Sequence, residues 1–425
     1  MSRSQEESGA RLPPLCNHTE CTADDVMLMC LTLGYRHNLT WVAVEGIMKM
    51  FNFVYGTKKI NATKISLMKR LFDGTDNTKV AFHYYCQTCC KYASKVDSGC
   101  QQDLVCCGNK LDDTNKATYF ATISFKDQLR NLFETNEQLA ESALTYRFSR
   151  VKQNKDNLDD GADYKAHAKP GKILSFAHNF SYSFFTDGVG KSKKSFWPIY
   201  VTINELPPGD RKNNILIVGL YYGNGAPNLK TFLKPFVDEA NKLSSSGFDW
   251  VHKGQVVNSK VIPLLCICDS DARYKLLNHQ SHKAFYGCTY CYQKQTHTAK
   301  GLKYTLTTKK IVERTKESLH LDLLLASSNR NKGKKHRHGR GVLGVSSVAY
   351  LNFFNQSRGM PVDYMHNLLL GAMNTYFENL FMEKCKKFWV DKDATPEDLQ
   401  KAIDERLLII KPPTCIKPSP ASSIL

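Results

Sequence analysis

Apolar residues recur every three or four positions in two early segments of the chain. The segments are 41–51 and 120–139, and this spacing predicts an amphipathic helix in each. After them the stretch 147–172 turns polar and contains the turn sequences Asp-Asp-Gly and Lys-Pro-Gly. We therefore expect a linker or a long loop over 147–172.

The pattern changes after residue 172 to one typical of strands. Segments 173–186 and 197–203 are rich in aromatic and β-branched residues, and 215–220 is continuously apolar. Helical spacing returns over 229–243, and a second apolar run at 261–268 predicts a buried strand followed by a helix. The predicted order is β-β-β-α-β-α. Two further helices are expected over 363–388 and from Thr395, where Thr-Pro-Glu-Asp supplies a cap.

The composition is that of a folded protein with a basic surface. The chain has 425 residues, of which 42% are hydrophobic, as is common for globular chains. Lys and Arg number 58 against 40 Asp and Glu, a net charge of +18 that favours a polyanionic partner, either nucleic acid or an acidic membrane surface. The apolar runs are too short to span a bilayer and the N-terminus is polar, so we expect an intracellular protein.

Two acidic residues stand at the ends of predicted strands. Asp187 ends the first strand of the predicted order and Asp269 ends the fourth. If these strands are neighbours, the two carboxylates face one another across a small gap, and paired carboxylates are what Mg²⁺ binds. Each residue alone also fits a local role, Asp187 in an Asp-Gly turn and Asp269 as a helix cap.

A series of ordered blocks, spread over roughly 230 residues, resembles the transposase of CACTA (En/Spm) DNA transposons. The blocks are Thr186-Asp-Gly, Lys193-Lys-Ser-Phe-Trp-Pro-Ile-Tyr, Ile203-Asn-Glu-Leu-Pro-Pro, Gly219-Leu-Tyr-Tyr-Gly, Phe232-Leu-Lys-Pro-Phe-Val-Asp-Glu, Cys268-Asp-Ser-Asp-Ala-Arg, Tyr286-Gly-Cys-Thr-Tyr-Cys, Gly359-Met-Pro-Val-Asp-Tyr-Met-His and Ile403-Asp-Glu-Arg-Leu-Leu-Ile-Ile-Lys-Pro-Pro.

The resemblance implies an RNase H-like DDE/D transposase that cleaves and joins DNA strands with bound Mg²⁺ or Mn²⁺. Asp187 and Asp269 match its first two catalytic acids. Its third acid lies beyond the Ile-Lys-Pro-Pro block, and the chain ends at Leu425 without that motif. A truncated transposase, inactive as this chain, is therefore expected.

The expected partner is DNA, both transposon ends and target, in the nucleus, and self-association is left open. No membrane partner and no small-molecule substrate are expected. The alternative is a non-catalytic relic that binds DNA or protein. A third reading, an RNA-binding zinc protein, lacks the aromatic motifs of common RNA modules.

The best-formed zinc half-site is Cys288-x-x-Cys291, because two thiolates at this spacing reach one ion on a tight turn. Inside a cell the fifteen cysteines stay reduced, so close pairs indicate metal ligands rather than disulfides. His366, whose motif the family also carries, or His297 could add a third ligand. A helix-cap or core role for His366 is equally open.

A second cysteine cluster begins at Cys86-x-x-Cys89, where the family carries a small zinc ribbon. Cys106 and Cys107 are its expected further ligands, with Cys100 as an alternative, because no second Cys-x-x-Cys follows. The expected metals are thus structural Zn²⁺ at the cysteines and Mg²⁺ or Mn²⁺ at the acids.

Basic residues cluster beside Asp187 and in a later Gly-rich loop. Neutralising phosphates gives sequence-independent affinity for DNA, although solvated loops have the same composition. The expected DNA contacts are Lys191, Lys193, Lys194, Lys332, Lys334, Lys335, Arg337 and Arg340.

The expected fold class is α/β, with an RNase H-like core, a partly helical insertion and an N-terminal region that contains the zinc ribbon. The expected divisions are an N-terminal helical region (1–80), a zinc-ribbon-like region with a helix (81–146), a linker (147–172), the RNase H-like core (173–293), a basic insertion (294–358) and a truncated C-terminal helical part (359–425).

Overall fold

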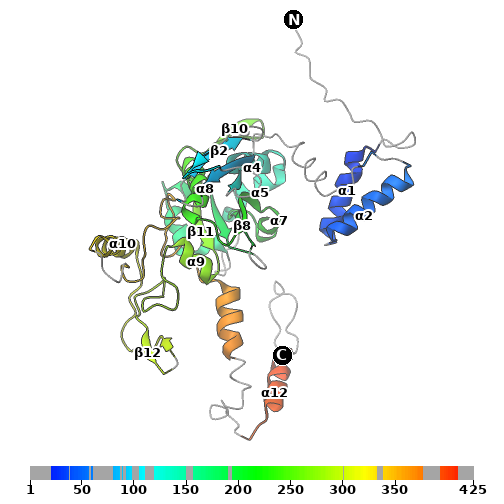
Figure 1. The fold of residues 1–425 in the computed structure, drawn as a ribbon. Coiled ribbons are helices and arrows are strands. Elements are labelled where there is room, and N and C mark those ends of the chain that lie inside the picture. The colour runs from blue at the N-terminus through cyan, green and yellow to red at the C-terminus, as the bar shows by residue number, and fades with distance from the viewer. Residues whose placement is uncertain are drawn as a thin grey trace. The chain divides into compact units, whose positions relative to one another are not determined.

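The computed structural model describes residues 21–37, 39–56, 59–60, 80–86, 89, 92–97, 105–110, 119–149, 157–189, 194–299, 301–332, 338–376 and 393–409. The chain divides into two compact units (Figure 1). One comprises Met1–Val80 with Asp97–Cys100, and the other comprises Ala81–Val96 with Gln101–Leu425.

The first unit is built on two helices, α1 (Ala23–Arg36) and α2 (Trp41–Val54). The hydroxyl of Thr40 accepts a hydrogen bond from the backbone N–H of Ala43 (3.3 Å) and caps the start of α2. The helices share a small apolar core that includes Val26, Met27, Cys30, Val44 and Met48. The helix predicted over 41–51 is confirmed.

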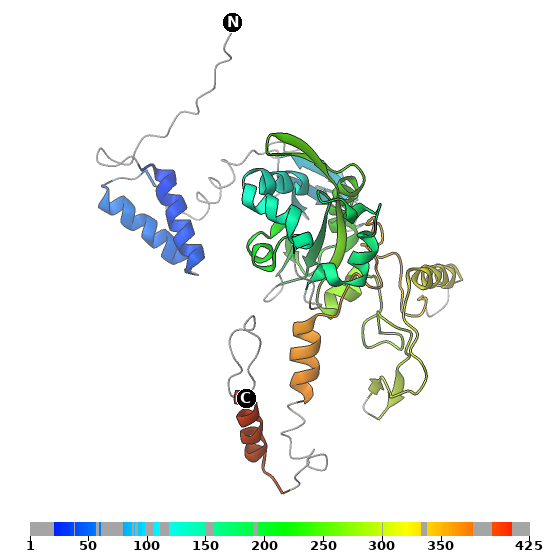
Figure 2. The same ribbon diagram turned by 180° about the vertical axis from the view of Figure 1, so that it is seen from behind.

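A seven-stranded sheet organises the second unit, and Figure 2 shows it from behind. Its strand order is β11-β6-β7-β8-β5-β1-β2. Consecutive strands β6, β7 and β8 are antiparallel, whereas β11 returns beside β6 and runs parallel to it. The strands are β1 (Val80–Tyr85), β2 (Tyr92–Asp97), β5 (Tyr119–Ile123), β6 (Phe180–Thr186), β7 (Lys194–Ile203), β8 (Leu216–Asn224) and β11 (Val261–Ile267).

The main core lies between β6 and the helices α4 (Phe125–Glu134), α5 (Glu137–Ser149) and α8 (Leu229–Ser245). Alternate residues of a strand point to the same face, and Phe180, Tyr182 and Phe184 are all fully buried. Their rings meet aromatic rings of the helices, with 4.9 Å between the centroids of Phe133 and Phe180 and 5.4 Å between those of Phe184 and Phe236. The β-β-β-α-β-α order is confirmed, and it ends with α9 (Ser270–Leu276).

An additional hairpin, which the sequence analysis did not predict, stands between α8 and β11. It consists of β9 (Phe248–His252) and β10 (Gln255–Ser259). The turn residues Lys253 and Gly254 have φ values of 49° and 77°, as a type I′ turn requires at both central positions. Trp250, on β9, is buried against Phe133 of α4.

The expected linker over 147–172 is wrong for its described part. Residues 157–172 form the turn η2 (Leu158–Asp160) and the helix α6 (Ala162–His167), and η3 (Ile173–Ser175) follows. Within the second unit, Tyr164 of α6 packs with Ile262 and Leu264 of β11. Tyr164 is buried, and its hydroxyl donates to Glu205 Oε1 over 3.0 Å. The buried Arg147 lies 3.5 Å from the same oxygen. Polar residues of this segment therefore contact a buried ion pair instead of facing solvent.

The later part of the second unit is an insertion with less regular structure. Asp322 is fully buried and accepts from Arg314 (3.0 Å), Arg340 (2.6 Å) and the Tyr292 hydroxyl (2.6 Å). This network joins α10 (Lys316–Asn331) to the segments that precede and follow it. The other elements of the insertion are β12 (Thr296–Thr298) and β13 (Gly301–Lys303). Three short elements lie earlier in the chain: β3 (Val105–Cys106), β4 (Asn109–Lys110) and α7 (Pro208–Asn213).

Two helices are described towards the C-terminus. The first, η4 (Tyr364–Met373), has wide π-type turns, and the second, α12 (Pro396–Ile409), begins where Thr395 and Asp398 cap one another. The helix predicted from Thr395 is thus confirmed. The helix predicted over 363–388 is helical as far as it is described, through residue 376, and the remainder lies outside the described residues. Among the residues described, no helix has the length and apolarity to cross a bilayer.

Candidate functional site

Asp187 and Asp269 lie at the same edge of the sheet. β6 and β11 are parallel neighbours whose last paired residues are Phe185 and Ile267, and each acid stands two residues further along its chain segment. Because parallel strands end at the same edge, this register places the two acids side by side.

The two carboxylates share a partly buried environment. Both side chains are partly buried, and burial, followed by the charge of Asp269, raises the pKa of Asp187. Asp187 Oδ1 accepts from the N–H of Gly188 (2.6 Å), and Asp269 Oδ1 accepts from the N–H of Ala272 (2.7 Å) and caps α9. The repulsion between two close carboxylates therefore acts on the ionisation of Asp187.

The glycine after Asp187 is needed for packing rather than for a left-handed turn. A Cβ atom at Gly188 would lie 2.5 Å from the ring of Trp197, which is closer than any side chain tolerates. The ring of Trp197 therefore lies directly over the backbone that carries the first acid. This contact holds Asp187 at the strand end.

The structure brings His366 to the two acids. Its Nδ1 forms a short hydrogen bond with the carboxylate of Asp363, and that bond, followed by the charges of Asp363, Asp269 and Asp187, raises the pKa of His366. A zinc site formed by His366 with Cys288 and Cys291 was expected, but the described residues do not assemble one. His366 instead interacts with Asp363 and lies in the field of the acid pair.

Backbone contacts explain how residues so far along the chain reach this edge. The N–H of Cys266 donates to the carbonyl of Gly359 (2.7 Å), so the segment before η4 lies against β11. A Cβ atom at Gly359 would lie 2.7 Å from the Asn355 carbonyl, which only glycine avoids. Ser270 Oγ then donates to Asn367 Oδ1 (3.0 Å) and joins the starts of α9 and η4.

Sequence reasoning missed the roles of Asp363, Ser270 and Asn367. The available signal was the three-residue spacing of Asp363 and His366, which places both side chains on one face of a helix. Helices with π-type turns are rare and are often found at functional sites. The turns of η4 begin directly after Asp363, beside the acid pair.

Cys288 and Cys291 form a close pair, with 3.4 Å between their sulfur atoms. Within the described part of the chain, no third Cys, His, Asp or Glu lies near enough to complete a metal site with them. The ring of His297, the other candidate ligand, packs edge-on against Phe285 instead, with 5.3 Å between the centroids. The pair therefore remains a half-site.

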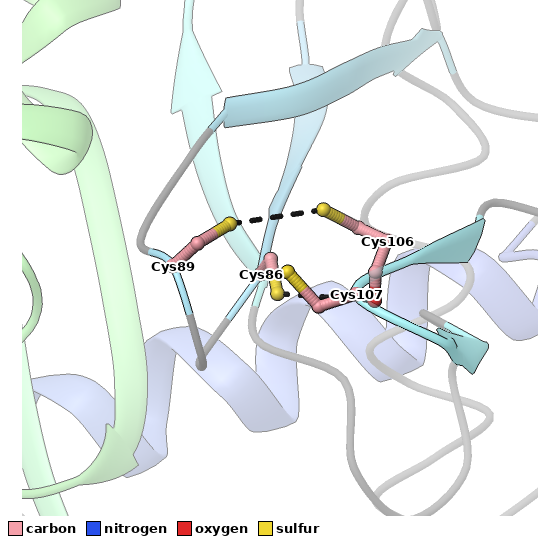
Figure 3. A group of neighbouring side chains, drawn as sticks. All are labelled: Cys86, Cys89, Cys106 and Cys107. Atoms are coloured by element: carbon pink, nitrogen blue, oxygen red, sulfur yellow. Dashed lines mark hydrogen bonds between the residues drawn. The ribbon is translucent and has the colours of Figure 1, made fainter.

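Four cysteines come together beyond the end of β1, far from the acid pair in the strand order. The sulfur atoms of Cys86, Cys89, Cys106 and Cys107 all lie within 4.8 Å of one another, and Figure 3 shows them converging from two loops. Those of Cys89 and Cys106 are 3.8 Å apart, which is about the separation of two thiolates bound 2.3 Å from a tetrahedral zinc. This cluster could hold a metal ion such as Zn²⁺, as the sequence predicted.

Two adjacent cysteines reach one site because they occupy a tight hairpin. Cys106 ends β3, and Cys107 and Gly108 form the turn to β4 with φ values of 51° and 76°. Hydrogen bonds of the Cys107 thiol with Cys89 and then with Cys86 and Cys106 raise the pKa of Cys107 to about 12. A metal ion would therefore release protons as it binds. Cys100, the alternative ligand, lies outside the described residues.

The predicted DNA-contacting side chains are only partly within the described structure. Lys332 is exposed at the end of α10. Arg340, in contrast, is bonded to Asp322 and stacks on Tyr292 with 4.6 Å to the ring centroid, so its guanidinium serves the fold of the insertion. Lys194 opens β7, and the residues outside the description are Lys191, Lys193, Lys334, Lys335 and Arg337.

Comparison with known proteins adds no family to these observations. No protein-family model matches the chain, and a search of curated proteins finds no significant match. The functional argument therefore depends on the site itself.

The cysteine cluster predicts a simple metal stoichiometry. We expect the purified chain to bind one Zn²⁺ tightly, and we expect Cys89→Ser and Cys106→Ser each to abolish that binding, because a thiolate ligand is lost. Metal analysis after dialysis, together with the thiolate absorption of the Co²⁺-loaded protein, measures this. Cys288→Ser is the matched control, and zinc lost in that variant as well would contradict the assignment to the four cysteines.

Proposed function

We propose that this chain is a DDE-type transposase that acts on DNA phosphodiester bonds at Asp187 and Asp269. The observation that carries the proposal is the side-by-side placement of these acids at the ends of β6 and β11. Divalent ions held there would activate the attacking oxygen and stabilise the leaving oxygen of a phosphodiester. The proposal implies DNA ends and target DNA as partners, and a nuclear location.

The strand order supports an RNase H-like core. In that fold three antiparallel strands are followed by a helix and a fourth strand parallel to the first. The chain has β6, β7 and β8 antiparallel in sequence, then α8, then β11 parallel to β6. The additional strands β5, β1 and β2 extend the sheet beyond β8 and leave the β6–β11 edge unchanged.

The side chains around the acids have separate roles in this proposal. Asp187 and Asp269 supply carboxylate oxygens for cations. His366, whose pKa the hydrogen bond with Asp363 and the neighbouring carboxylates raise, supplies a positively charged donor near a phosphate. Ser270 and Asn367 fix η4 to α9, which keeps His366 in place.

A non-catalytic, DNA-binding relic is the second candidate. It is favoured by the ligand count, because no third carboxylate, histidine or cysteine in the described ranges completes a metal-binding group with Asp187 and Asp269. Two carboxylates bind divalent ions more weakly than three and position the nucleophile less well. In this case the basic surface would still bind DNA while the acids no longer support cleavage.

Nicking of supercoiled DNA by the full chain distinguishes the two candidates. If the chain is an enzyme, we expect nicking with Mg²⁺ or Mn²⁺ and none with a chelator. If it is a relic, we expect salt-sensitive DNA binding without nicking. Neither nicking nor binding would exclude both candidates.

A further inference from the structure

A hollow with aromatic rings lies at the end of β6 and β11 that is opposite the acid pair. Its space measures about 850 Å³, and Asn179, just before β6, and Lys260, just before β11, both line it. β6 lies between Asn179 and Asp187, and strands rise about 3.3 Å per residue, so roughly 25 Å separates the hollow from the acids. The hollow is therefore a separate site.

Two phenylalanine rings of the hollow are open to solvent. Phe176 is 50% exposed and Phe353 is 45% exposed, although both belong to segments packed on the core. The backbone of Phe176 is fixed, because its carbonyl accepts from the buried guanidinium of Arg147 (2.7 Å) and from the N–H of Asn179 (3.1 Å). A ring held on a fixed backbone loses little entropy when a planar ligand stacks on it.

The backbone at Phe353 is held in an unfavourable conformation. Its φ is 67°, a left-handed value that is uncommon for a bulky residue and that costs of order 1 kcal/mol or more. The residues just before Phe353 hold this conformation. The N–H of Asn352 donates to Asn241 Oδ1 (2.8 Å), and the side-chain amide of Asn241 donates to the carbonyl of Tyr350 (2.8 Å). Strain that exposes an apolar ring, rather than burying it, indicates a binding role.

The charge of the hollow matches a phosphate backbone. Lys260 and His178 line it, the exposed Lys172 stands between the lining residues Gly171 and Ile173, and no lining residue is acidic. The nearby carboxylate of Asp249 is bonded to the amide of Asn258 (2.7 Å). Exposed rings together with basic groups are the combination that binds single-stranded nucleic acid, by base stacking and phosphate neutralisation.

We propose that this hollow binds single-stranded nucleic acid, with bases stacked on Phe176 and Phe353 and phosphates beside Lys260 and Lys172. A duplex fits less well, because its bases are already stacked on one another and offer only phosphates to the lysines. This binding site goes beyond strand cleavage at Asp187 and Asp269 and does not depend on it.

The test is the affinity of the full chain for a fluorescein-labelled oligothymidylate, measured by fluorescence anisotropy. We expect Phe176→Ala and Phe353→Ala each to weaken binding by about tenfold, because each removes one stacking surface. Phe353→Trp should retain the affinity of the unchanged chain. The affinity for a duplex of the same length should change less than twofold in all three variants.

Tyr119→Ala is the matched control, because Tyr119 is 40% exposed on β5, four strands away from β11 in the sheet order. Unfolding curves that coincide with that of the unchanged chain show that each variant is folded. Unchanged oligothymidylate binding in both Phe→Ala variants would overturn the proposal, as would equal losses for oligothymidylate and duplex. Loss of nicking with this binding intact would concern only the acid pair.

Discussion

Replacing Asp187 with Asn is expected to reduce Mg²⁺-dependent nicking by a factor on the order of 1000, equivalent to about 4 kcal/mol of transition-state stabilisation, if the full chain cleaves DNA as the proposed enzyme would. Asn has the same shape and still accepts the Gly188 hydrogen bond, but it carries no charge to hold a cation. Asp269→Asn should have a similar effect. Asn caps a helix as well as Asp does, so α9 should keep its start. Rates of plasmid nicking measure the loss, and duplex affinity should stay unchanged.

Asp271→Asn is the matched control for these variants. Asp271 lies on α9, the helix that Asp269 caps, but the carboxylate of Asp271 is exposed and paired with Lys275. We expect nicking within twofold of the unchanged chain. Full nicking in both Asp187→Asn and Asp269→Asn would refute the catalytic assignment and would leave DNA binding as the remaining function.

The acid pair could be predicted because strand patterns fix where each acid stands. The segment before Asp187 is rich in aromatic residues and the segment before Asp269 is continuously apolar. The buried strands β6 and β11 end within one or two residues of both acids, although β6 begins only at Phe180, later than the predicted 173. The hairpin β9–β10 was missed because its turn, Lys253–Gly254, lacks the Asn-Gly or Asp-Gly sequence that usually marks a type I′ turn. Local sequence therefore predicted the core strands better than the hairpins and loops that connect them.

The position of His366 could not be read from spacing. His366 follows Cys291 by 75 residues in the chain, and so large a separation gives no information about which segment the histidine contacts after folding. The deciding contacts are between backbones, such as the Cys266 N–H to the Gly359 carbonyl, and these leave no side-chain pattern. The cluster of four cysteines was easier to predict from the sequence, because a Cys-x-x-Cys pair and a Cys-Cys-Gly turn each restrict the chain to a tight loop.

Burial of charge was the least predictable feature. The polar composition of 147–172 suggested a linker, yet Arg147 is 4% exposed and Glu205 is 1% exposed. Glu205 accepts from the N–H of Ser181 (2.8 Å), the Ser181 hydroxyl (2.9 Å) and the Tyr164 hydroxyl (3.0 Å). Glu205 therefore joins β6, α6 and the end of α5. Nothing in the sequence of 147–172 indicates that Glu205 is the residue these side chains contact.

Glu205→Ala is consequently expected to lower the free energy of unfolding of the second unit by about 3–5 kcal/mol, because the buried Arg147 loses its counter-charge. Tyr164 and Ser181 also lose their shared acceptor, and a buried unsatisfied donor costs about 1–3 kcal/mol. Urea unfolding followed by tryptophan fluorescence measures the change, since Trp250 is buried in this unit. Asp238→Ala, which removes an exposed pairing with Lys234, should shift the curve little.

A double variant separates the ion pair from simple loss of packing. In Arg147→Met with Glu205→Leu no buried charge is left without a partner, and apolar replacements of a buried pair are often neutral. We therefore expect the double variant to be more stable than Glu205→Ala. The single variants Arg147→Met and Glu205→Leu complete the cycle. If their separate losses of stability add up to the loss in the double variant, Arg147 and Glu205 stabilise the fold independently, through their separate contacts with Phe176, Ala177 and Ser181.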